Sequence, residues 1–483
     1  METAGRVRAY KAAMSRAIHA NRAQVFLLPP NLDDWLAPTH PVRFVADLVD
    51  SLDLDALGFR ASVGDEGRPH YAAELLLGVW LYGWMERVRS SRALEKACQR
   101  DMAFVWLTSN LHPDHNTLWR FFRDNKKALK KLFARVVIIA AEADLVGFAL
   151  HALDGTKVQG ASSMESTLHR KTLTERLKKL EATVDASVAQ IEANEERPGP
   201  EWKMPATLAD KEERKKRIRE ELAKLDAADT NHLHPREPDA RVMKTREGPR
   251  LGYNAQAVVD HDSDLIVAID ISGDETDHHQ LVPMTQAVHD TLGEVAEQTL
   301  ADAGYASGGQ FEVAERRHLP VLVNVQEESS DKGPYAKSQF KYDAEHDTYV
   351  CPLGEILPFQ RVEQPTKSKP HARRTYRCHN KQCPVRAQCT TDKGGRAIKR
   401  LVTEEAFERQ VERQSGADKR VLMSLRKEII EHAFGNVKAN HGFRRFTAFG
   451  LVGAAAQWAL ICLAVNLRKL LPAWREGRLL ATG

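Results

Sequence analysis

The chain has 483 residues, about two to four times the length of a typical domain, so its length predicts more than one structural unit. Hydrophobic residues make up 42% and charged residues 28% of the sequence, which excludes a wholly disordered or fibrous protein. Lys and Arg total 70 against 66 Asp and Glu, a formal charge of +4. That balance is too mild to indicate a nucleic-acid partner, so the distribution of the charge is more informative than its sum.

The first residues, METAGRVRAYKAAMSR, are charged and lack the apolar core of a signal peptide, which predicts a cytoplasmic protein. The most apolar stretch, Leu451 to Val465, is shorter than the ~20 residues of a membrane span, so we expect a buried helix there. Cysteines of a cytoplasmic protein should stay reduced. Cys98 and Cys462 each lie alone in an apolar helical context, which is typical of core residues.

The N-terminal region, residues 1–145, is predicted to be helical. YAAELLLGVWLYGWMERV is apolar nearly all round a helix, and ALEKACQRDMAFVWL and TLWRFFRDNKKALKKLFARVVIIAA follow the helical period. Turn signals at Ser90–Ser91 and Asn110–Asn116 separate these segments. The last helix carries Arg120, Arg123 and several lysines. This pattern favours a helix-turn-helix-like DNA reader over an ordinary bundle with a solvated basic face.

Residues 146–165 and 235–326 show alternating strand and helix patterns in the order β, β, β, α, β, α, β. VGFALHALDG is a strand pattern that ends at Asp154, GYNAQAVVD and LIVAIDIS form a hairpin pattern, and TLADAGYAS contains a strand that ends near Asp302. Loops at strand ends are where functional residues collect, so both aspartates are candidate Mg²⁺ ligands. Taken alone, each is more simply interpreted as a turn-forming residue.

Two insertions interrupt this core. Residues 166–234 carry apolar residues at spacings of three and four on either side of the break ERPGPEWKMP, which predicts an antiparallel helical hairpin. Its charged surface favours packing or self-association over DNA binding. Residues 327–402 include a basic segment, 366–400, with eleven Lys and Arg, among them Arg373 and Arg374, and one acid. A net charge of +10 indicates a polyanionic partner for this segment.

Residues 403–483 return to helical periodicity, and the segment RKEIIEHAFGNVK contains a third candidate acid. Glu431 and Lys438 are seven residues, or two helical turns, apart. They are therefore expected on one helix face, with Arg426 or Lys427 one turn back. A carboxylate for a metal ion and an ammonium group for a phosphate is a combination suited to phosphoryl transfer.

Ten motifs spread over most of the chain together resemble the DDE-class transposases of bacterial insertion sequences. They are FLLPPNLDDWLAPTHPVRFVADLVDSLDL, SSRALEKAC, PDHNTLWRFFR, ALDGTKV, GYNAQAVVD, LADAGYAS, YVCPLGE, CPVRAQCT, EHAFGNVKANHGFRRFTAFG and WALICLAVNLRKL. The resemblance implies an α/β fold with a ribonuclease H-like mixed-sheet core. This core would carry a helical N-terminal DNA-binding region, the helical hairpin insertion and the basic, Cys-bearing insertion.

The resemblance also implies roles for individual residues. Asp154, Asp302 and Glu431 would form a metal-binding triad for two Mg²⁺ or Mn²⁺ ions, and Lys438 would contact the backbone of the transposon end. Relatives often show a Tyr and an Arg before this Glu, but Ser424 and Lys427 occupy those places here. The other basic side chains expected at DNA are those of Arg426, Lys427, Arg444, Arg445, Arg120, Arg123, Arg373 and Arg374. The implied partners are transposon-end inverted repeats and target DNA, bound by a homodimer at the bacterial nucleoid.

Four cysteines fall within the second insertion. They are Cys351, Cys378, Cys383 and Cys389. The last three are separated by four and five residues, unlike the paired C-x-x-C pattern, so a structural zinc site and a reduced, packed thiol cluster stay open as alternatives.

A second polar cluster lies at a strand exit and helix start. It consists of Asp270, Asp274, Asp277, His278 and His279. Aspartates are expected as helix caps at such places, so capping is favoured over metal binding.

The sequence therefore predicts a transposase that cuts DNA at the ends of an insertion sequence and joins the freed 3′ hydroxyl to target DNA by two-metal phosphoryl transfer. One alternative is a ribonuclease H-like nuclease that cuts without joining. Another is a catalytically decayed copy that only binds DNA. The sequence has no Gly-rich phosphate loop, so ATP is not implied.

Overall fold

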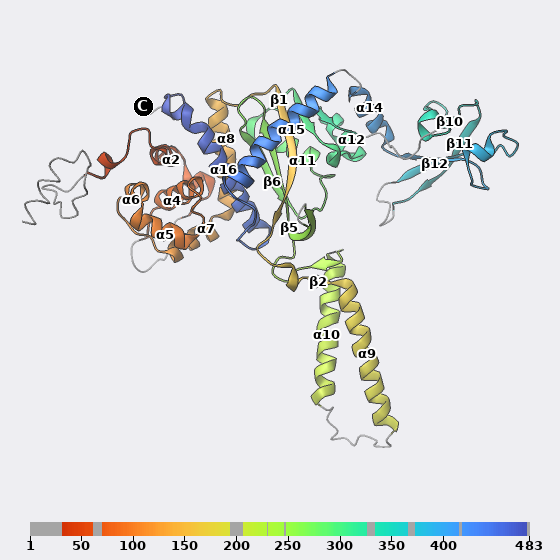
Figure 1. The fold of residues 1–483 in the computed structure, drawn as a ribbon, viewed down its shortest axis with the longest axis horizontal. Helices are drawn as coiled ribbons and strands as arrows, with labels where there is room; N and C mark the ends of the chain where they lie inside the picture. Colours follow the sequence, from red (N-terminus) through yellow and green to blue (C-terminus); the bar gives the residue numbers. More distant parts are fainter. Residues whose placement is uncertain are drawn as a thin grey trace, which may run out of the picture.

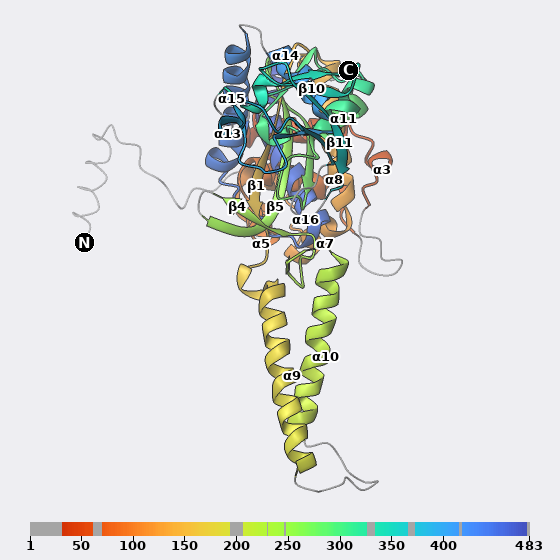
Figure 2. The same cartoon turned by 90° about the vertical axis from the view of Figure 1, so that its right-hand side faces the viewer.

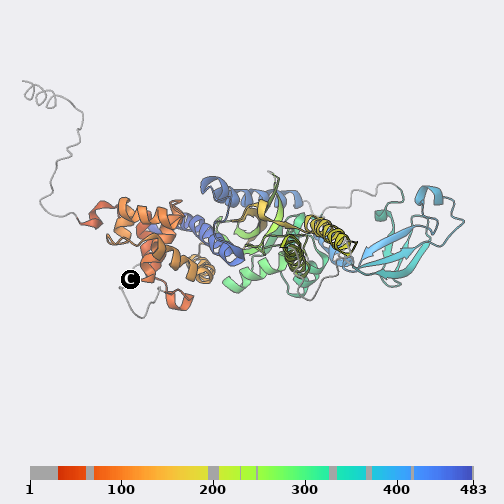
Figure 3. The same ribbon diagram turned by 90° about the horizontal axis from the view of Figure 1, so that it is seen from below.

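The chain is described from a computed structural model that covers residues 31–60, 70–193, 206–228, 230–245, 248–325, 334–365, 372–414 and 418–480. N-terminal helices, a central α/β core and a small β-sheet lie in a row, and a long helical hairpin projects from the core (Figures 1 and 3). The break ERPGPEWKMP and the start of the FLLPPNLDDW motif lie outside the described residues.

The N-terminal region is helical, as the sequence predicts. Its elements are η1 (Leu32–Trp35), α2 (Pro41–Asp50), α3 (Leu54–Leu57), α4 (Ala73–Met85), α5 (Ser91–Arg100), α6 (Met102–Leu107), α7 (His115–Asp124) and α8 (Lys126–Glu142). Every residue of α4 from Leu76 to Met85 is buried, which explains its uniformly apolar sequence. The predicted turns supply helix caps, since Ser90 accepts a hydrogen bond from the backbone of α5 and Asp114 from that of α7.

The core is built on a mixed six-stranded sheet, which confirms the predicted α/β class. Its strands are β1 (Leu150–Gln159), β4 (Arg241–Thr245), β5 (Gly248–Asp260), β6 (Ile266–Ser272), β7 (Gln298–Ala301) and β8 (Val321–Val323). The order is β4-β5-β1-β7-β8, and β6 also pairs with β5. The β1–β7 and β7–β8 pairs are parallel and the remaining pairs are antiparallel. The helices around this sheet are α11 (Leu281–Leu292), α12 (Gly308–Arg316), α14 (Glu404–Gln414), α15 (Lys419–Gly435) and α16 (Gly450–Arg475).

Strand β1 is longer than its sequence pattern indicates, and this corrects the position of Asp154. The pattern placed Asp154 at the end of a strand, but β1 continues to Gln159. Antiparallel pairing with β5 runs from His151↔Asp260 through Gln159↔Gly252 and keeps the whole segment extended. Asp154 therefore lies in the middle of a strand, whereas Asp302 directly follows β7, as predicted.

Helix α16 connects the N-terminal helices to the sheet. It packs on α4, α8 and β6, and the Asn466 side chain bonds both backbone groups of Ile266 in β6, at 2.9 and 2.8 Å. In the described part of the chain, α16 is the one helix long and apolar enough to cross a membrane, but 78% of its apolar window is buried within the structure. This burial is typical of a core helix, as expected for Leu451 to Val465.

The first insertion forms two long helices, α9 (Arg170–Ala193) and α10 (Ala206–Ala227), that pack on each other. The short strands β2 (Leu168–His169) and β3 (His232–Leu233) pair at its base, and η2 (Met164–Ser166) precedes them. The hairpin points away from the core in both side views (Figures 1 and 2). Leu173, Leu225 and Leu233 form its small buried core.

The second insertion forms a five-stranded antiparallel sheet. Its elements are η4 (Lys337–Gln339), β9 (Lys341–Asp343), β10 (Thr348–Val350), β11 (Ile356–Glu363), β12 (Arg373–Arg377), α13 (Arg386–Cys389) and β13 (Ala397–Leu401). Five buried side chains form its core, namely Phe340, Tyr349, Leu357, Tyr376 and Ile398. So small a core limits the stability that apolar burial alone can provide.

Candidate functional site

Asp154 and Asp302 meet because their strands are parallel neighbours. Ala152 of β1 lies opposite Leu300 of β7, so the residues two positions further along, Asp154 and Asp302, lie at the same level of the sheet. Both carboxylates approach one guanidinium nitrogen of Arg426, from helix α15, with Oδ2 to Nη2 distances of 3.1 and 3.6 Å. The sequence predicted that these two aspartates would come together, but it did not place Arg426 between them.

Burial makes Asp154 hard to ionise. Burial is the largest cause of a rise in the pKa of Asp154 from 3.8 to about 6; Arg426 opposes this rise, and the negative charges of Asp302 and Asp277 add to it. The Arg426 side chain is only 10% exposed and also donates to the Leu153 carbonyl at 3.4 Å. The two carboxylates therefore lie where a positive charge is strongly favoured.

Asp277 is a third carboxylate beside this pair, although the sequence predicted only a capping role for it. Its Oδ1 accepts hydrogen bonds from the side-chain amides of Asn254 and Gln256, both at 2.7 Å. Lys157 of β1 approaches the same oxygen at 3.3 Å. Asn254 and Gln256 are two residues apart on β5, so they point to the same face of the sheet. That alternation in GYNAQAVVD is the sequence signal that could have indicated a polar site.

Two glycines leave room for these carboxylates. A Cβ atom on Gly155 would lie 2.5 Å from Asp277 Oδ1 and 2.3 Å from Gln256 Nε2, and a Cβ on Gly304 would lie 2.9 Å from Asp302 Oδ1. All three contacts are closer than a real Cβ atom allows. The DG in ALDG and the DAG in LADAG therefore pair each aspartate with a glycine that makes room for a neighbouring carboxylate or amide.

Tyr305 lies in the buried part of the site, next to Gln256. It is fully buried, and its hydroxyl donates to Gln256 Oε1. Burial raises the pKa of Tyr305 well above its usual value, with the charges of Asp277, Asp154 and Asp302 adding to the effect. The phenol therefore stays protonated and fixes the Gln256 amide so that its NH₂ group faces Asp277.

Glu431 and Lys438 do not reach this pair of aspartates in the structure. Glu431 is 68% exposed and pairs with Lys427 at 3.7 Å. It follows Arg426 by five residues, or about 140° around the helix, so it leaves α15 on a different side. Lys438 lies beyond α15, in the π-helical turn η5 (Asn436–Asn440).

The arrangement fits a divalent cation in part. Two carboxylate oxygens already converge on one positive group, and hard cations such as Mg²⁺ prefer such oxygen ligands. Among the described residues, however, no three His, Cys, Asp or Glu side chains are grouped as a metal site. Asp154 and Asp302 therefore suit a metal ion, while Glu431 does not join them in this arrangement.

The five polar residues between 270 and 279 do not form one cluster in the structure, because they contact different partners. Asp270 pairs with Lys130 of α8 at 2.8 Å, and Asp274 accepts a hydrogen bond from Gln280 at 2.7 Å. His278 and His279 are exposed. Of the five, Asp277 is the residue that contacts the surroundings of Asp154, so the five do not form a metal site of their own.

The four cysteines of the second insertion are neighbours. The pKa of the Cys389 thiol is raised, chiefly by burial, and the charges of Cys383, Cys351 and Cys378 contribute to that rise. The Cys351 sulfur also accepts a hydrogen bond from the Glu355 backbone at 3.3 Å. The thiols are near one another, but within the described residues they are not arranged as a closed set of metal ligands.

Many cations of the basic segment are neutralised by acids that lie outside it. Arg374 pairs with Asp347 at 2.6 Å, Lys399 with Glu363 at 2.8 Å, and Arg400 with Glu408 at 2.6 Å. Arg373 is half-buried on β12, and Lys367 and Lys369 lie outside the described residues. The charge of +10 counted along the sequence therefore overstates the positive potential of this sheet.

The other arginines expected at DNA differ in whether they are bonded within the protein. Arg120 of α7 is exposed, whereas Arg123 pairs with Asp124 at 2.7 Å. Arg444 is exposed, and Arg445 donates to the backbone carbonyls of Gly160 and Ala161. Arg445 therefore holds the segment that follows β1, in addition to any contact with DNA.

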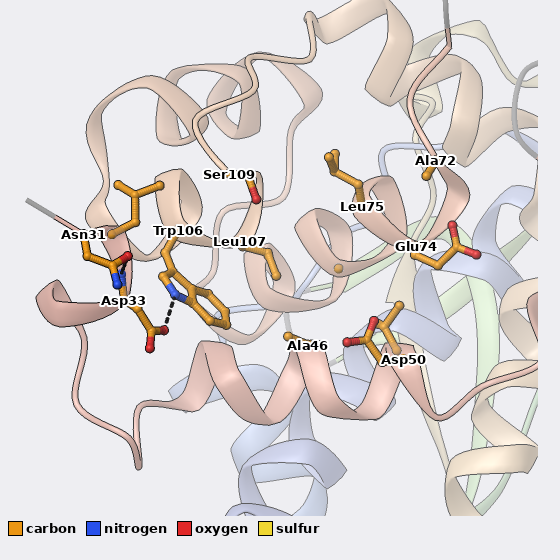
Figure 4. A pocket seen from close by; sticks show the side chains of 13 residues that line it. Asn31, Asp33, Ala46, Asp50, Ala72, Glu74, Leu75, Trp106, Leu107 and Ser109 are labelled. Atoms are coloured by element: carbon orange, nitrogen blue, oxygen red, sulfur yellow. Dashed lines mark hydrogen bonds between the residues drawn. The ribbon is translucent and has the colours of Figure 1, made fainter. Parts of the chain in front are cut away.

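A cavity of about 550 Å³ opens among the N-terminal helices, but it does not suit DNA (Figure 4). Asp33, Asp50 and Glu74 line it. The Trp106 indole donates to Asp33 at 3.0 Å, and Arg43 pairs with the same carboxylate at 2.7 Å. Negative charges of this kind repel phosphate, so a DNA surface on these helices must lie elsewhere.

The raised pKa of Asp154 predicts a pH-dependent effect on stability. Since its pKa is higher in the folded chain than unfolded, its contribution is fully present below pH 3.8 and is lost as the pH rises through about 6. In metal-free buffer, Asp154→Asn should therefore raise the free energy of unfolding at pH 7.5 by up to about 3 kcal/mol relative to wild type. Urea unfolding should show this difference shrinking towards pH 4. A difference that is constant across this range would show that burial of the Asp154 charge is not its cause.

Two family comparisons identify the chain. Residues 350–471 match the transposase DDE domain, which includes α15 and Glu431, and residues 30–124 match the transposase domain DUF772, which includes α7. No curated protein matches the chain. A DDE domain implies a ribonuclease H-like core and the use of divalent metal ions, and the mixed sheet is consistent with this core. The chain thus carries matches to two transposase domains, one of them a DDE domain, and the DDE match indicates a DNA transposase.

Proposed function

We propose that this transposase cuts DNA at the ends of a bacterial insertion sequence and joins the freed 3′ hydroxyl to target DNA. The observation that carries the proposal is the convergence of Asp154 and Asp302 on one positive group at the same level of parallel strands. Phosphoryl transfer of this kind requires cations held by carboxylates at the reacting phosphate.

In this proposal Asp154 and Asp302 hold the divalent ions, two Mg²⁺ or Mn²⁺. When bound, the ions activate the attacking oxygen and stabilise the leaving one. Arg426 neutralises the two carboxylates in their absence and is positioned to donate to a phosphate oxygen when DNA is present. Asp277, fixed by Asn254 and Gln256, adds negative charge that favours cations at the pair.

Glu431 completes the triad in this proposal, as the resemblance implies. It must first leave Lys427, and an exposed ion pair of this kind contributes at most about 1 kcal/mol. Breaking this pair therefore costs little, but Glu431 reaches the aspartates only if α15 also changes its position, since Glu431 leaves that helix about 140° from Arg426. Lys438 would then hold the backbone of the transposon end, from the π-helical turn beyond α15.

The remaining DNA contacts are assigned to basic residues of α7, of the segment after η5 and of the second insertion. Arg120 and Arg123 on α7 would read or hold the element end, while Arg444, Arg373 and Arg374 would contact the backbone. Two ends must be brought together, which favours a homodimer on DNA. We place this activity at the nucleoid, in the bacterial cytoplasm.

Replacing the two aspartates should separate chemistry from binding. Asp154→Asn or Asp302→Asn should reduce Mg²⁺-dependent nicking of an end-bearing duplex by at least about 1000-fold, because each removes a charged ligand. End binding measured by gel shift in EDTA should change by less than about twofold, because phosphate contacts elsewhere supply the affinity. Glu431→Gln should behave in the same way.

Asp270→Asn is the matched control for this test, since Asp270 lies on strand β6 of the same sheet and pairs with Lys130. Its nicking rate should match wild type. Nicking without strand transfer by the wild-type protein would favour the nuclease alternative. End binding without any nicking would favour a decayed copy.

Asp277 should affect the reaction through the charge of the site. Asp277→Asn should lower kcat by about 10- to 100-fold and raise the Mg²⁺ concentration for half-maximal rate, while Asp277→Glu should restore part of both. Asp274→Asn, three residues earlier, should leave both unchanged because the Asp274 carboxylate bonds Gln280 instead. Equal behaviour of the Asp274 and Asp277 variants would show that Asp277 acts only as a turn residue.

We propose that the cysteine cluster holds one structural zinc ion. The four thiols lie beside a core of only five buried side chains, and small cores of this kind are commonly stabilised by a metal. Protein purified under reducing conditions should contain about one equivalent of zinc, and a thiol-specific reagent should release it with loss of thermal stability. Metal analysis that finds no zinc in the reduced protein would rule the site out.

A further inference from the structure

A groove of about 420 Å³ runs between the two helices of the hairpin insertion. The hairpin groove is lined by Arg176, Lys179 and Leu180 of α9 and by Arg214, Arg217 and Ile218 of α10. The four basic residues are exposed. None of the six lining residues is acidic. Both helices therefore contribute two cations to one surface that spans about one helical turn of each.

The other side of α10 has a different charge pattern. Arg219 lies two residues after Arg217, which is about 200° around the helix, and it pairs across the hairpin with Glu181 of α9 at 2.8 Å. On that side, acid and base from the two helices are brought together. On the groove side, Arg217 pairs with Glu213 of its own helix at 2.5 Å, so its partner does not come from α9. One side of the hairpin thus carries the cross-helix ion pair Arg219–Glu181, and the groove side is cationic.

This asymmetry argues against self-association through the groove. Two copies that met groove to groove would bring eight cations together around Leu180, Ile218 and the aliphatic stems of the basic residues. Like charges in such contact oppose association. A polyanion, in contrast, would gain from the cations of the groove, including Arg217 once it leaves Glu213, and would release its bound counterions.

We propose that the hairpin groove binds the phosphate backbone of duplex DNA, independently of base sequence. The proposal rests on the proposed function, since it assumes that DNA passes close to the core. Helix α9 has 24 residues and is therefore about 36 Å long, which is close to one turn of B-DNA. The hairpin is long enough to lie beside one turn of duplex, and the hairpin groove, which spans about 6 Å of each helix, would contact the phosphates along a short part of that length.

The position of the hairpin suits this role. Its base, the β2–β3 pair, follows shortly after β1, the strand that carries Asp154, and the hairpin then extends away from the core (Figures 1 and 2). The hairpin groove therefore holds DNA at a distance from the reacting phosphate. Its contribution should appear in binding, and in the salt dependence of binding, but not in the chemical step.

The test compares two double variants of the full-length protein. Arg214→Gln/Arg217→Gln removes two groove cations, and Lys216→Gln/Arg219→Gln removes two cations two residues further along the same helix. Gln has a helix propensity similar to that of Lys and Arg, and all four positions are exposed, so folding should be preserved. Each pair includes one arginine with an acidic partner, Glu213 or Glu181. The two variants are thus matched in charge, helix and ion pairing.

Binding is measured in EDTA to an end-bearing duplex and to a random duplex over a range of salt concentrations. The groove variant should lose affinity for both duplexes, by about tenfold near 0.1 M salt, and its slope of log K against log salt should fall by roughly 1 to 2. The control variant should bind both duplexes within about twofold of wild type. Nicking by the groove variant at saturating protein should match wild type.

Equal losses in the two variants would show an effect of net charge alone and overturn the inference. Unchanged DNA binding together with an altered sedimentation coefficient would identify the groove as a protein interface and overturn it as well. If wild type binds and cuts DNA while the groove variant binds equally well, only the groove inference fails. If wild type binds no duplex, the proposed function fails first and the groove inference with it.

Discussion

Two aspartates, a mostly buried one on β1 and a half-exposed one just after β7, lie at the same level of neighbouring parallel strands with a positive charge between them. Asp154 and Asp302 are brought to the same level by the pairing of β1 with β7, and Arg426 supplies the charge from α15. A buried carboxylate next to another is costly without a cation, as the raised pKa of Asp154 shows. Much of the core can be understood as the framework that holds this arrangement, since α15 packs on both strands.

Helix α16 also fixes this framework. Trp458 donates to the backbone carbonyl of Gln256, and Asn466 bonds both backbone groups of Ile266. Gln256 in turn bonds Asp277 and Tyr305. A continuous chain of hydrogen bonds therefore links the apolar helix α16 to the carboxylates. Such buried networks require every member to be satisfied, which makes the positions of the polar side chains highly specific.

The sequence predicted those features of the site that depend on local pattern. The strand before Asp302 and the helical N-terminal region both follow from periodicity and turn residues. The extension of β1 beyond Asp154 depends on its partner β5, which lies about 100 residues away, and no local pattern encodes that pairing. The same is true of Arg426 and Asp277. Their roles arise only when β1, β5, β7 and α15 are brought together.

The electrostatic potential of each insertion depends on which charged residues are neighbours in the fold, and the sequence alone does not give these neighbours. The basic segment of the second insertion has a net charge of +10 along the chain, yet Asp347, Glu363 and Glu408, all outside it, neutralise three of its cations. The hairpin insertion has a nearly balanced sequence, yet its two sides differ because residues two positions apart on a helix point in opposite directions. Electrostatic attraction of DNA depends on cations that lie together without acids between them. In this transposase the hairpin groove comes close to that condition, on the segment for which the sequence favoured packing or self-association over DNA binding.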